Sequence, residues 1–401
     1  MGRRKPRKSP RRVYPTSQPG RVIVEDVRHA GAWVHRNQLV EYERLNGLDG
    51  VWTAALDEVF DHDWLNEQID VQHVVAKGML GPPYSVYTRG LANIADLVCA
   101  VKQGGPGAAS VLRRLQVHEQ FRGACAEASV ARLIHEAGLP FLFDIAKGEG
   151  QSYDITVGGP RPFAVEVKSR VRSERAMALD AVQTMVMMEV SHVAMGCRLS
   201  LDWSGDEART LPLGGDFPGR IRTLANRTAT AILGAVMAER GPPASRLEIA
   251  LPGLGVATLH RDAAAPNHFE VDDRSDPHLE ARRFAASVVE AAPQLKGDLP
   301  GVVFVCAGSQ EVDPEAMVVV STELFERQGM EMPQISGVIL LRNSGVESIR
   351  EETHPIPNPH ASVSLADIPL AEAQHPAVRE RWVLAEPFGM VVPAPGFPSA
   401  C

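Results

Sequence analysis

The clearest alternation of apolar and polar positions in the chain falls on Phe163–Ser169, which has the sequence Phe-Ala-Val-Glu-Val-Lys-Ser. On a strand, the residues at odd positions point to one face, whereas Glu166 and Lys168 point to the other. We expect the first face to pack and the second to carry chemistry. Upstream, residues 153–157 predict another short strand, and the Gly-Gly-Pro-Arg-Pro run at 158–162 predicts a hairpin turn between them.

A helix is predicted immediately before this hairpin, over residues 121–135. Glu127 lies on its small, apolar face, because its neighbours at three and four residues are Gly123, Ala124, Val130 and Ala131. Gly138 then predicts the end of the helix, and residues 141–143 predict a strand. Glu127 is therefore expected to point inward, although an ordinary charge on the helix surface is the alternative.

Helical and strand patterns alternate through the rest of the chain, which favours a mixed α/β sheet. Helices are expected around residues 39–45, 91–101, 176–195, 221–240, 279–295 and 315–328, and further strands at 197–203, 247–251, 255–259, 301–306 and 335–341. No P-loop, serine-hydrolase elbow or dinucleotide fingerprint is present.

Pairing of the two predicted strands would bring the carboxylate of Asp154 close to that of Glu166. Two carboxylates held together repel each other unless a cation lies between them, and a hard divalent cation with oxygen ligands is the usual solution. Lys168 beside them could orient or activate a water molecule. Two simpler interpretations stay open: Glu166 and Lys168 as an exposed ion pair, and Asp154 as a residue that favours the start of a strand.

In this order and spacing, Asp154 and Glu166-Val167-Lys168 resemble the PD-(D/E)XK nuclease superfamily, and Glu127 fits the glutamate that the family often adds from a preceding helix. The resemblance covers about residues 108–200, with Tyr153 where the family's name has proline. It implies a restriction-endonuclease-like mixed sheet flanked by helices, with N-terminal and C-terminal elaborations.

The same resemblance implies roles for individual residues. Asp154, Glu166, Glu127 and the Val167 carbonyl would hold Mg²⁺ or Mn²⁺, and Lys168 would position the attacking water and stabilise charge on the phosphate. Gln183 falls on the next predicted helix, where some members place a polar accessory residue.

Basic residues follow the motif directly. Arg170, Arg172 and Arg175 are opposed only by Glu174, so this segment is expected to contact a nucleic-acid backbone. A solvated helix start is the alternative.

Charge is segregated along the chain, whose formal net charge is −8. Residues 1–20 carry seven basic side chains and no acidic one, which leaves −15 for the remainder. We expect this Pro- and Arg-rich arm to be disordered and to fasten the protein to nucleic acid, with a solubilising tail as the alternative.

The five cysteines have no paired spacing for zinc or redox chemistry, and the apolar runs are shorter than a membrane helix needs. Both features predict a cytoplasmic protein with reduced thiols and no membrane partner.

The expected organisation is a basic arm at 1–20, a region of unassigned role at 21–105, a nuclease-like core at 106–205, an α/β extension or second domain at 206–354, and a Pro-rich irregular tail at 355–401. The expected function is metal-dependent hydrolysis of phosphodiester bonds in DNA for restriction, defence or repair, with RNA as the open alternative substrate. A homodimer would supply two active sites for cutting two strands. The competing hypotheses are a non-catalytic nucleic-acid-binding or assembly protein with the same fold, and an interaction module without a site.

Overall fold

The computed structural model describes the chain in segments. These are residues 39–40, 43, 50–67, 73, 75–76, 79, 85–143, 153–170, 174–190, 197–205, 217–239, 245–261, 271–273, 277–295, 297–308, 312–342, 350–380, 382–385 and 390–393. The basic arm expected at residues 1–20 lies outside them.

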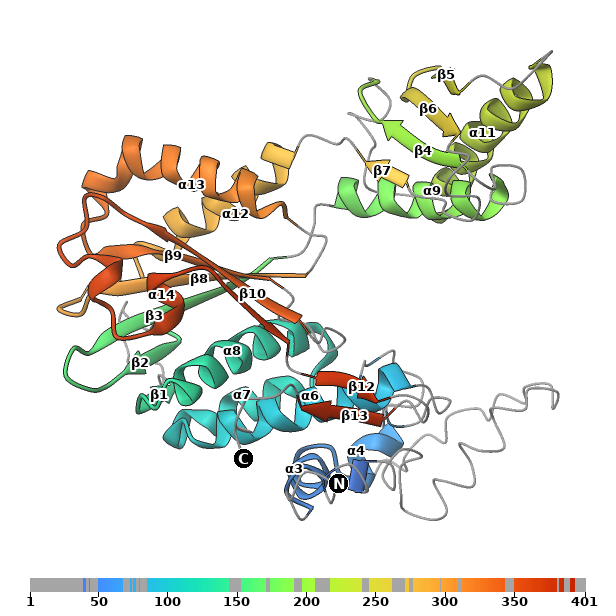
Figure 1. Ribbon diagram of the computed structural model, residues 1–401. Helices are drawn as coiled ribbons and strands as arrows, with labels where there is room; N and C mark the ends of the chain where they lie inside the picture. The colour runs from blue at the N-terminus through green and yellow to red at the C-terminus, as the bar shows by residue number, and fades with distance from the viewer. Residues whose placement is uncertain are drawn as a thin grey trace, which may run out of the picture.

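A seven-stranded mixed sheet forms the centre of the molecule (Figure 1). In spatial order its strands are β1 (Phe141–Phe143), β2 (Ile155–Val157), β3 (Phe163–Ser169), β8 (Gly301–Ala307), β9 (Ile335–Arg342), β10 (Arg350–Pro357) and β11 (Ala377–Glu380). The three central strands β3, β8 and β9 run parallel, and the flanking pairs are antiparallel. The predicted hairpin between 153–157 and 163–169 is confirmed, with Ile155 opposite Val165.

Helices cover both faces of this sheet (Figure 1). The helices α6 (Ser85–Lys102), α7 (Ala108–Leu115) and α8 (His118–Glu136) lie on one side, and α12 (Pro277–Ala291) and α13 (Pro314–Gln328) on the other. Phe163 and Val165 share a core with α8, whereas Ala164 shares one with α12 and α13. Because β8 is buried on both faces, each of its residues is inaccessible to water, as expected for a central parallel strand.

Local sequence signals explain several element ends. α8 stops before Gly138, which adopts a φ of 69° and donates its N–H to the His135 carbonyl at 2.8 Å. α13 begins after Asp313, whose carboxylate accepts the backbone N–H groups of Glu315 and Ala316. The expected helix stop at Gly138 is thus confirmed.

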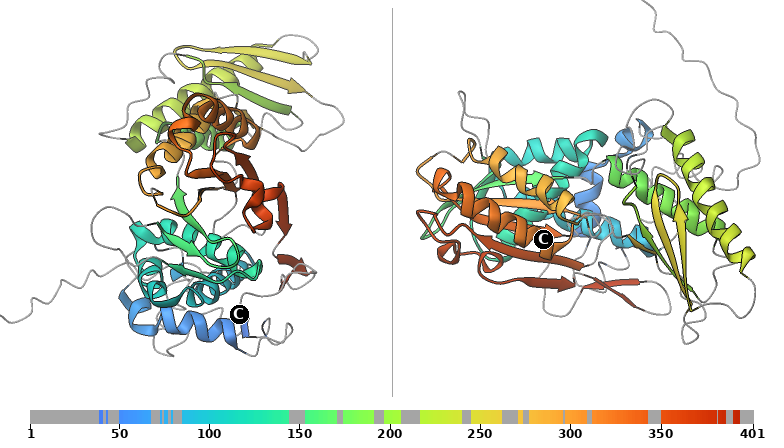
Figure 2. Two further views of the ribbon diagram at one scale, coloured as in Figure 1. Left: turned by 90° about the vertical axis from the view of Figure 1, so that its left-hand side faces the viewer. Right: turned by 90° about the horizontal axis from the view of Figure 1, so that it is seen from above.

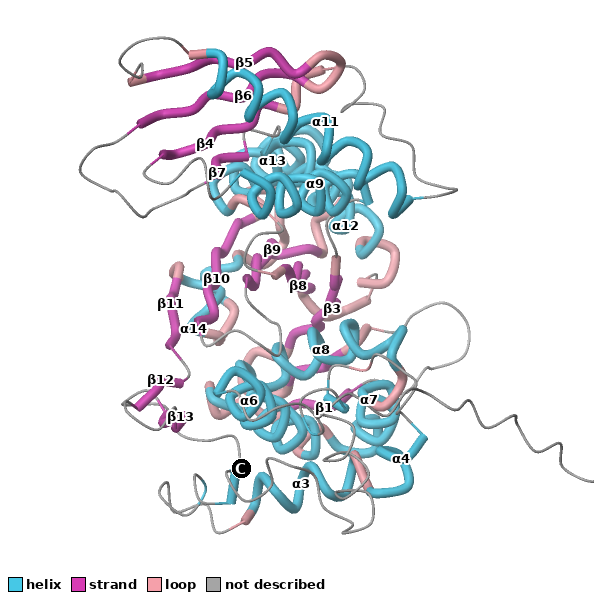
Figure 3. The backbone as a smooth tube through the Cα atoms, turned by 90° about the vertical axis from the view of Figure 1, so that its right-hand side faces the viewer, coloured by secondary structure: helices cyan, strands magenta, loops and turns pink. Residues whose placement is uncertain are grey.

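A second, smaller unit is inserted between β3 and α12; we call it the insertion unit (residues 174–273). It contains α9 (Glu174–Val190), β4 (Cys197–Asp202), α11 (Phe217–Ala238), β5 (Arg246–Leu251), β6 (Gly255–Arg261) and β7 (Val271–Asp273). Its strands form a separate sheet of order β5-β6-β4-β7, and its helices pack on that sheet through their own apolar core. In Figures 2 and 3 this unit lies beyond the central sheet, at the end of the molecule opposite α3 (Val51–Val59).

The sheets divide the chain differently from the boundaries expected at 205 and 206. β4 falls within the residues expected for the nuclease-like core but pairs with β6 and β7 in the insertion unit. β8 and β9 fall within the expected extension but complete the central sheet. The reason is that a parallel strand needs a long crossover, and here the whole insertion unit lies within the connection from β3 to β8.

The C-terminal region also departs from the irregular tail expected from residue 355. Pro355 and Pro357 belong to β10, beyond the stretch Arg350–Thr353 that β11 pairs, so their missing N–H groups fall on an open edge. η4 (Leu365–Asp367) and α14 (Ala371–Gln374) follow, and β12 (Trp382–Ala385) pairs with β13 (Met390–Pro393).

The N-terminal region contributes α3, α4 (His62–Glu67), η2 (Gly105–Gly107) and α6, which contains the helix predicted at 91–101. Cys99 on α6 is disulfide-bonded, so the reduced thiol expected at this position is wrong, whereas Cys125 and Cys306 are free and buried. In the described part of the chain, no helix combines the length and apolar character needed to cross a bilayer.

A buried network of charged residues joins α6 and α8 to strand β10. Arg132 of α8 is fully buried and donates to Asn93 at 2.6 Å and Asp96 at 3.2 Å on α6, and to Glu351 on β10.

Candidate active site

Glu166 and Lys168 are both largely buried on β3. Lys168 Nζ donates to Glu166 Oε1 at 2.6 Å and to Gln294 Oε1 at 2.7 Å. Their side chains are 3% and 18% exposed for Glu166 and Lys168 respectively, so the alternative of an exposed surface pair is wrong. Gln294 follows α12, and the ammonium group is therefore held between the strand and the helical layer that contains α12.

Asp154 directly precedes β2 and is connected to β3 by two hydrogen bonds. Its backbone N–H donates to the Val165 carbonyl at 3.1 Å, and its Oδ2 accepts the Val167 N–H at 2.7 Å. The hairpin therefore brings Asp154 beside the strand that carries Glu166, as the sequence predicted. Because the N–H and C=O groups of one strand residue point to the same side, the Val167 carbonyl also faces the Asp154 side of β3.

Glu127 of α8 is buried and is held by a residue that the sequence did not single out. Arg114 at the end of α7 donates one nitrogen to each carboxylate oxygen of Glu127, both at 2.5 Å. Asp154 and Glu127 both raise the pKa of Arg114, with the Glu127 hydrogen bond the larger cause. The guanidinium group thus neutralises Glu127 beside the other two carboxylates.

Burial raises the pKa of both remaining carboxyl groups. For Asp154, burial and the charges of Glu166 and Glu127 raise the pKa to about 7, against the lowering effect of the Val167 N–H. For Glu166, burial raises the pKa, the Lys168 hydrogen bond and charge lower it, and the charge of Glu127 raises it. Three acidic groups therefore influence one another here, which is typical of sites whose chemistry depends on shifted acidity.

The donor set fits a hard divalent cation. The Oε2 atom of Glu166 is buried and has no hydrogen-bond partner among the described residues, an arrangement that costs free energy unless a cation or donor binds it. Asp154, Glu166 and the Val167 carbonyl supply oxygen ligands of the kind that Mg²⁺ and Mn²⁺ prefer. Glu127 could add a further oxygen ligand, in competition with its ion pair to Arg114. In keeping with that ion pair, the described residues contain no group of three His, Cys, Asp or Glu side chains arranged to hold a metal ion.

The three arginines that follow the motif lie in different parts of the structure. Arg170 Nε donates to Ser287 Oγ at 2.7 Å, and its guanidinium pairs with Glu290, so α12 already neutralises much of its charge. Arg175 lies in α9, and Arg172 lies outside the described residues. The structure therefore makes Arg170 a residue that anchors the end of β3 to α12.

Gln183, the expected accessory residue, belongs to α9 in the insertion unit, where its buried Oε1 has no hydrogen-bond partner among the described residues. The structure instead brings Gln294 to Lys168. The helix that follows β3 in the sequence enters the insertion unit, and α12 occupies the place beside the strand.

Two residues of the site thus escaped sequence reasoning, Arg114 and Gln294. Arg114 carried a usable signal, since it is a basic residue in the last turn of a helix that ends just before α8. Gln294 lies 126 positions beyond Lys168 and has no local motif, so only the tertiary fold could place it.

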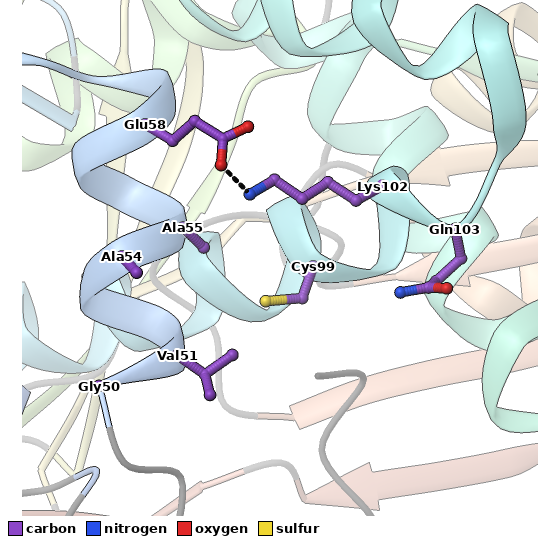
Figure 4. Close-up of a pocket in the computed structure, with 8 residues that line it drawn as sticks. All are labelled: Gly50, Val51, Ala54, Ala55, Glu58, Cys99, Lys102 and Gln103. Atoms are coloured by element: carbon purple, nitrogen blue, oxygen red, sulfur yellow. Dashed lines mark hydrogen bonds and ion pairs between the residues drawn. The ribbon is translucent and has the colours of Figure 1, made fainter.

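A cavity of about 480 Å³ lies apart from these residues, between α3 and α6 (Figure 4). Its lining residues are Gly50, Val51, Ala54, Ala55, Glu58, Cys99, Lys102 and Gln103. Lys102 Nζ donates to Glu58 Oε2 at 2.7 Å on its wall. None of the predicted site residues lines it.

No protein-family model, curated protein or solved structure matches the chain. A function is therefore inferred from the side chains at β2, β3 and α8 alone.

Proposed function

We propose that the protein is a metal-dependent nuclease that hydrolyses phosphodiester bonds in DNA, with Mg²⁺ or Mn²⁺ as cofactor. The observation that supports this proposal most is the meeting of Asp154, directly before β2, with Glu166 and Lys168 on the adjacent strand β3, where both carboxyl groups have a raised pKa. A structural ion pair would need one carboxylate for one lysine. The nearby, half-buried carboxylate of Asp154 and the buried Glu166 Oε2, which has no hydrogen-bond partner among the described residues, are not explained by such a pair.

The order of elements supports the resemblance to the PD-(D/E)XK nucleases. α8 with Glu127 is followed by β1, by β2 with Asp154 directly before it, and by β3 with Glu166 and Lys168. These elements belong to one mixed sheet flanked by helices, which is the architecture that a restriction-endonuclease-like fold requires.

The chemistry divides among the residues as follows. Asp154, Glu166 and the Val167 carbonyl would hold the metal, which supplies a lowered water pKa and neutralises charge on the phosphate when bound. Lys168 would orient the attacking water and stabilise the anionic phosphate, because its ammonium is fixed by Glu166 and Gln294. Asp154, with a pKa of about 7, has to lose its proton before it binds a cation.

One observation favours a second function, nucleic-acid binding or assembly without catalysis. Arg114 donates to both oxygens of Glu127 and so competes with metal binding by one of the three expected carboxylate ligands. A protein that kept the fold and lost the reaction would tolerate such an ion pair permanently.

The first experiment measures cleavage of supercoiled DNA, linear duplex DNA, single-stranded DNA and RNA in Mg²⁺, Mn²⁺ or EDTA. We expect the wild type to cut DNA only with metal, and Lys168→Ala to lower the rate by at least about 100-fold, equivalent to roughly 2.7 kcal/mol of barrier. Lys102→Ala is the matched control, because it removes an ion-paired lysine far along the chain on α6.

Cleavage that survives in EDTA, or that Lys168→Ala leaves intact, would contradict the proposal. Metal binding without cleavage of any nucleic acid would favour the non-catalytic function, and equal loss in Lys102→Ala would show a general effect of removing a lysine.

A further inference from the structure

Helix α11 of the insertion unit presents an unusual solvent-facing surface. Its 22 residues contain three arginines and no acidic residue. The buried positions, among them Ile221, Leu224 and Ala225, face the core of the unit. The exposed positions between 220 and 230 carry only long basic or small polar side chains, namely Arg220, Arg222, Thr223, Asn226, Arg227 and Thr230.

These arginines differ from others of the same unit in their partners. Arg246 pairs with Glu248 at 2.5 Å, and Arg261 pairs with Glu239. Arg220 and Arg222 form no ion pair or hydrogen bond within the described residues. Arg227, on the same exposed face, donates to the Pro252 carbonyl at 2.7 Å, which restrains its side chain. The surface of α11 therefore keeps the positive charges of Arg220 and Arg222, whereas glutamates balance those of Arg246 and Arg261.

The position of the unit connects this surface to the candidate active site. The chain enters the unit directly after β3, which carries Glu166 and Lys168, and leaves it directly before α12, which Gln294 follows. The connection into the unit and the connection out of it therefore both adjoin elements that position Lys168. A long polyanion bound to α11 would be tethered to the site that the proposed function assigns to cleavage.

We propose that the exposed face of α11, from Arg220 to Thr230, binds duplex DNA. This inference rests on the proposed nuclease function. Unpaired arginines bind phosphate oxygens, and asparagine and threonine side chains can donate to phosphates or to base edges. The major groove of B-form DNA admits an α-helix, whereas the deep, narrow major groove of duplex RNA does not. With few aromatic residues in the chain and none on this face, stacking on single strands has no platform.

The test measures binding to a fluorescent 30-base-pair DNA duplex in EDTA, so that metal binding and cleavage play no part. We expect Arg220→Ala/Arg222→Ala to bind at least about tenfold more weakly than the wild type, and the slope of log K against log salt to fall by about 2. The control variant is Arg246→Ala/Arg327→Ala, which removes the same charge from two exposed arginines that have glutamate partners. Circular dichroism confirms that both variants are folded.

Equal binding by the two double variants would overturn the inference, because charge alone would then account for affinity. Preference for duplex RNA or for single-stranded DNA over the duplex, lost in the same variant, would overturn the assignment of the partner. The failures are separable: metal-dependent cleavage with unchanged binding by Arg220→Ala/Arg222→Ala removes only this inference, and duplex binding without any cleavage removes only the proposed reaction.

Discussion

Among single side chains, Asp154 leads to a specific prediction about how the free energy of unfolding depends on pH. Its pKa is raised from 3.8 to about 7 in the folded protein, so folding favours the protonated acid. The contribution to stability is complete below pH 3.8 and is lost as the pH rises through 7, a difference of up to about 4 kcal/mol. Asp154→Asn cannot ionise and can still accept the Val167 N–H. We therefore expect it to be more stable than the wild type, by an amount that grows between pH 4 and pH 8.

Urea denaturation at a series of pH values measures this effect. Asp367→Asn is the control, because that carboxylate is 55% exposed and pairs with an exposed arginine. A gain that stays constant with pH would mean that Asp154 does not carry its proton into the neutral range.

The charge of Arg114 is expected to weaken metal binding at the candidate site. Removing its positive charge from beside three carboxyl groups should strengthen Mn²⁺ binding at pH 8, on the order of tenfold. Calorimetry of Arg114→Ala and of the neighbouring Arg113→Ala compares the loss of the same charge with and without the Glu127 contact. Weaker binding by Arg114→Ala would show instead that Arg114 is needed to orient Glu127.

At the scale of secondary structure, α8 contains a glycine in its interior, where this residue lowers the stability of a helix. Gly123 lies one turn before Glu127, and no described atom lies within 4 Å of the place where a Cβ would stand. Gly123→Ala should therefore raise the free energy of unfolding by about 0.5–1 kcal/mol. We expect it also to slow DNA cleavage, because the absence of a side chain at this turn lets the DNA backbone approach the helix. Faster or unchanged cleavage in the stabilised variant would show that nothing approaches the helix there.

The elements that the sequence could predict are those with local signals. The α8 helix, its stop at Gly138 and the β2–β3 hairpin depend on periodicity and turn residues within about 50 positions, and all are confirmed. The pairing of β3 with β8 could not be predicted, because no local sequence pattern indicates which distant strand lies beside β3. The same limit applies to Gln294 and to the pairing of β4 in the second sheet, neither of which has a local signal.

At the scale of the whole molecule, the network around Arg132 joins α6, α8 and β10. Arg132→Met would leave Asp96 and Glu351 buried without their cation, at a cost of about 3–5 kcal/mol. Arg161→Met, which breaks a pair whose partners are 65% and 55% exposed, should cost no more than about 1 kcal/mol. Chemical denaturation of both variants measures the difference. Similar small losses would mean that the helices and the sheet do not depend on this network.

The distance along the chain between β3 and β8 also sets an order of events during synthesis. Ala164 pairs with Gly301, 137 residues later, and at roughly 5–20 residues per second a ribosome needs about 7–27 s to cover that interval. Throughout this time β3 has one unpaired edge, and Lys168 lacks Gln294. The candidate site therefore becomes complete only after the whole insertion unit has been synthesised, and the nascent chain has to keep an apolar strand from associating with other chains until β8 emerges.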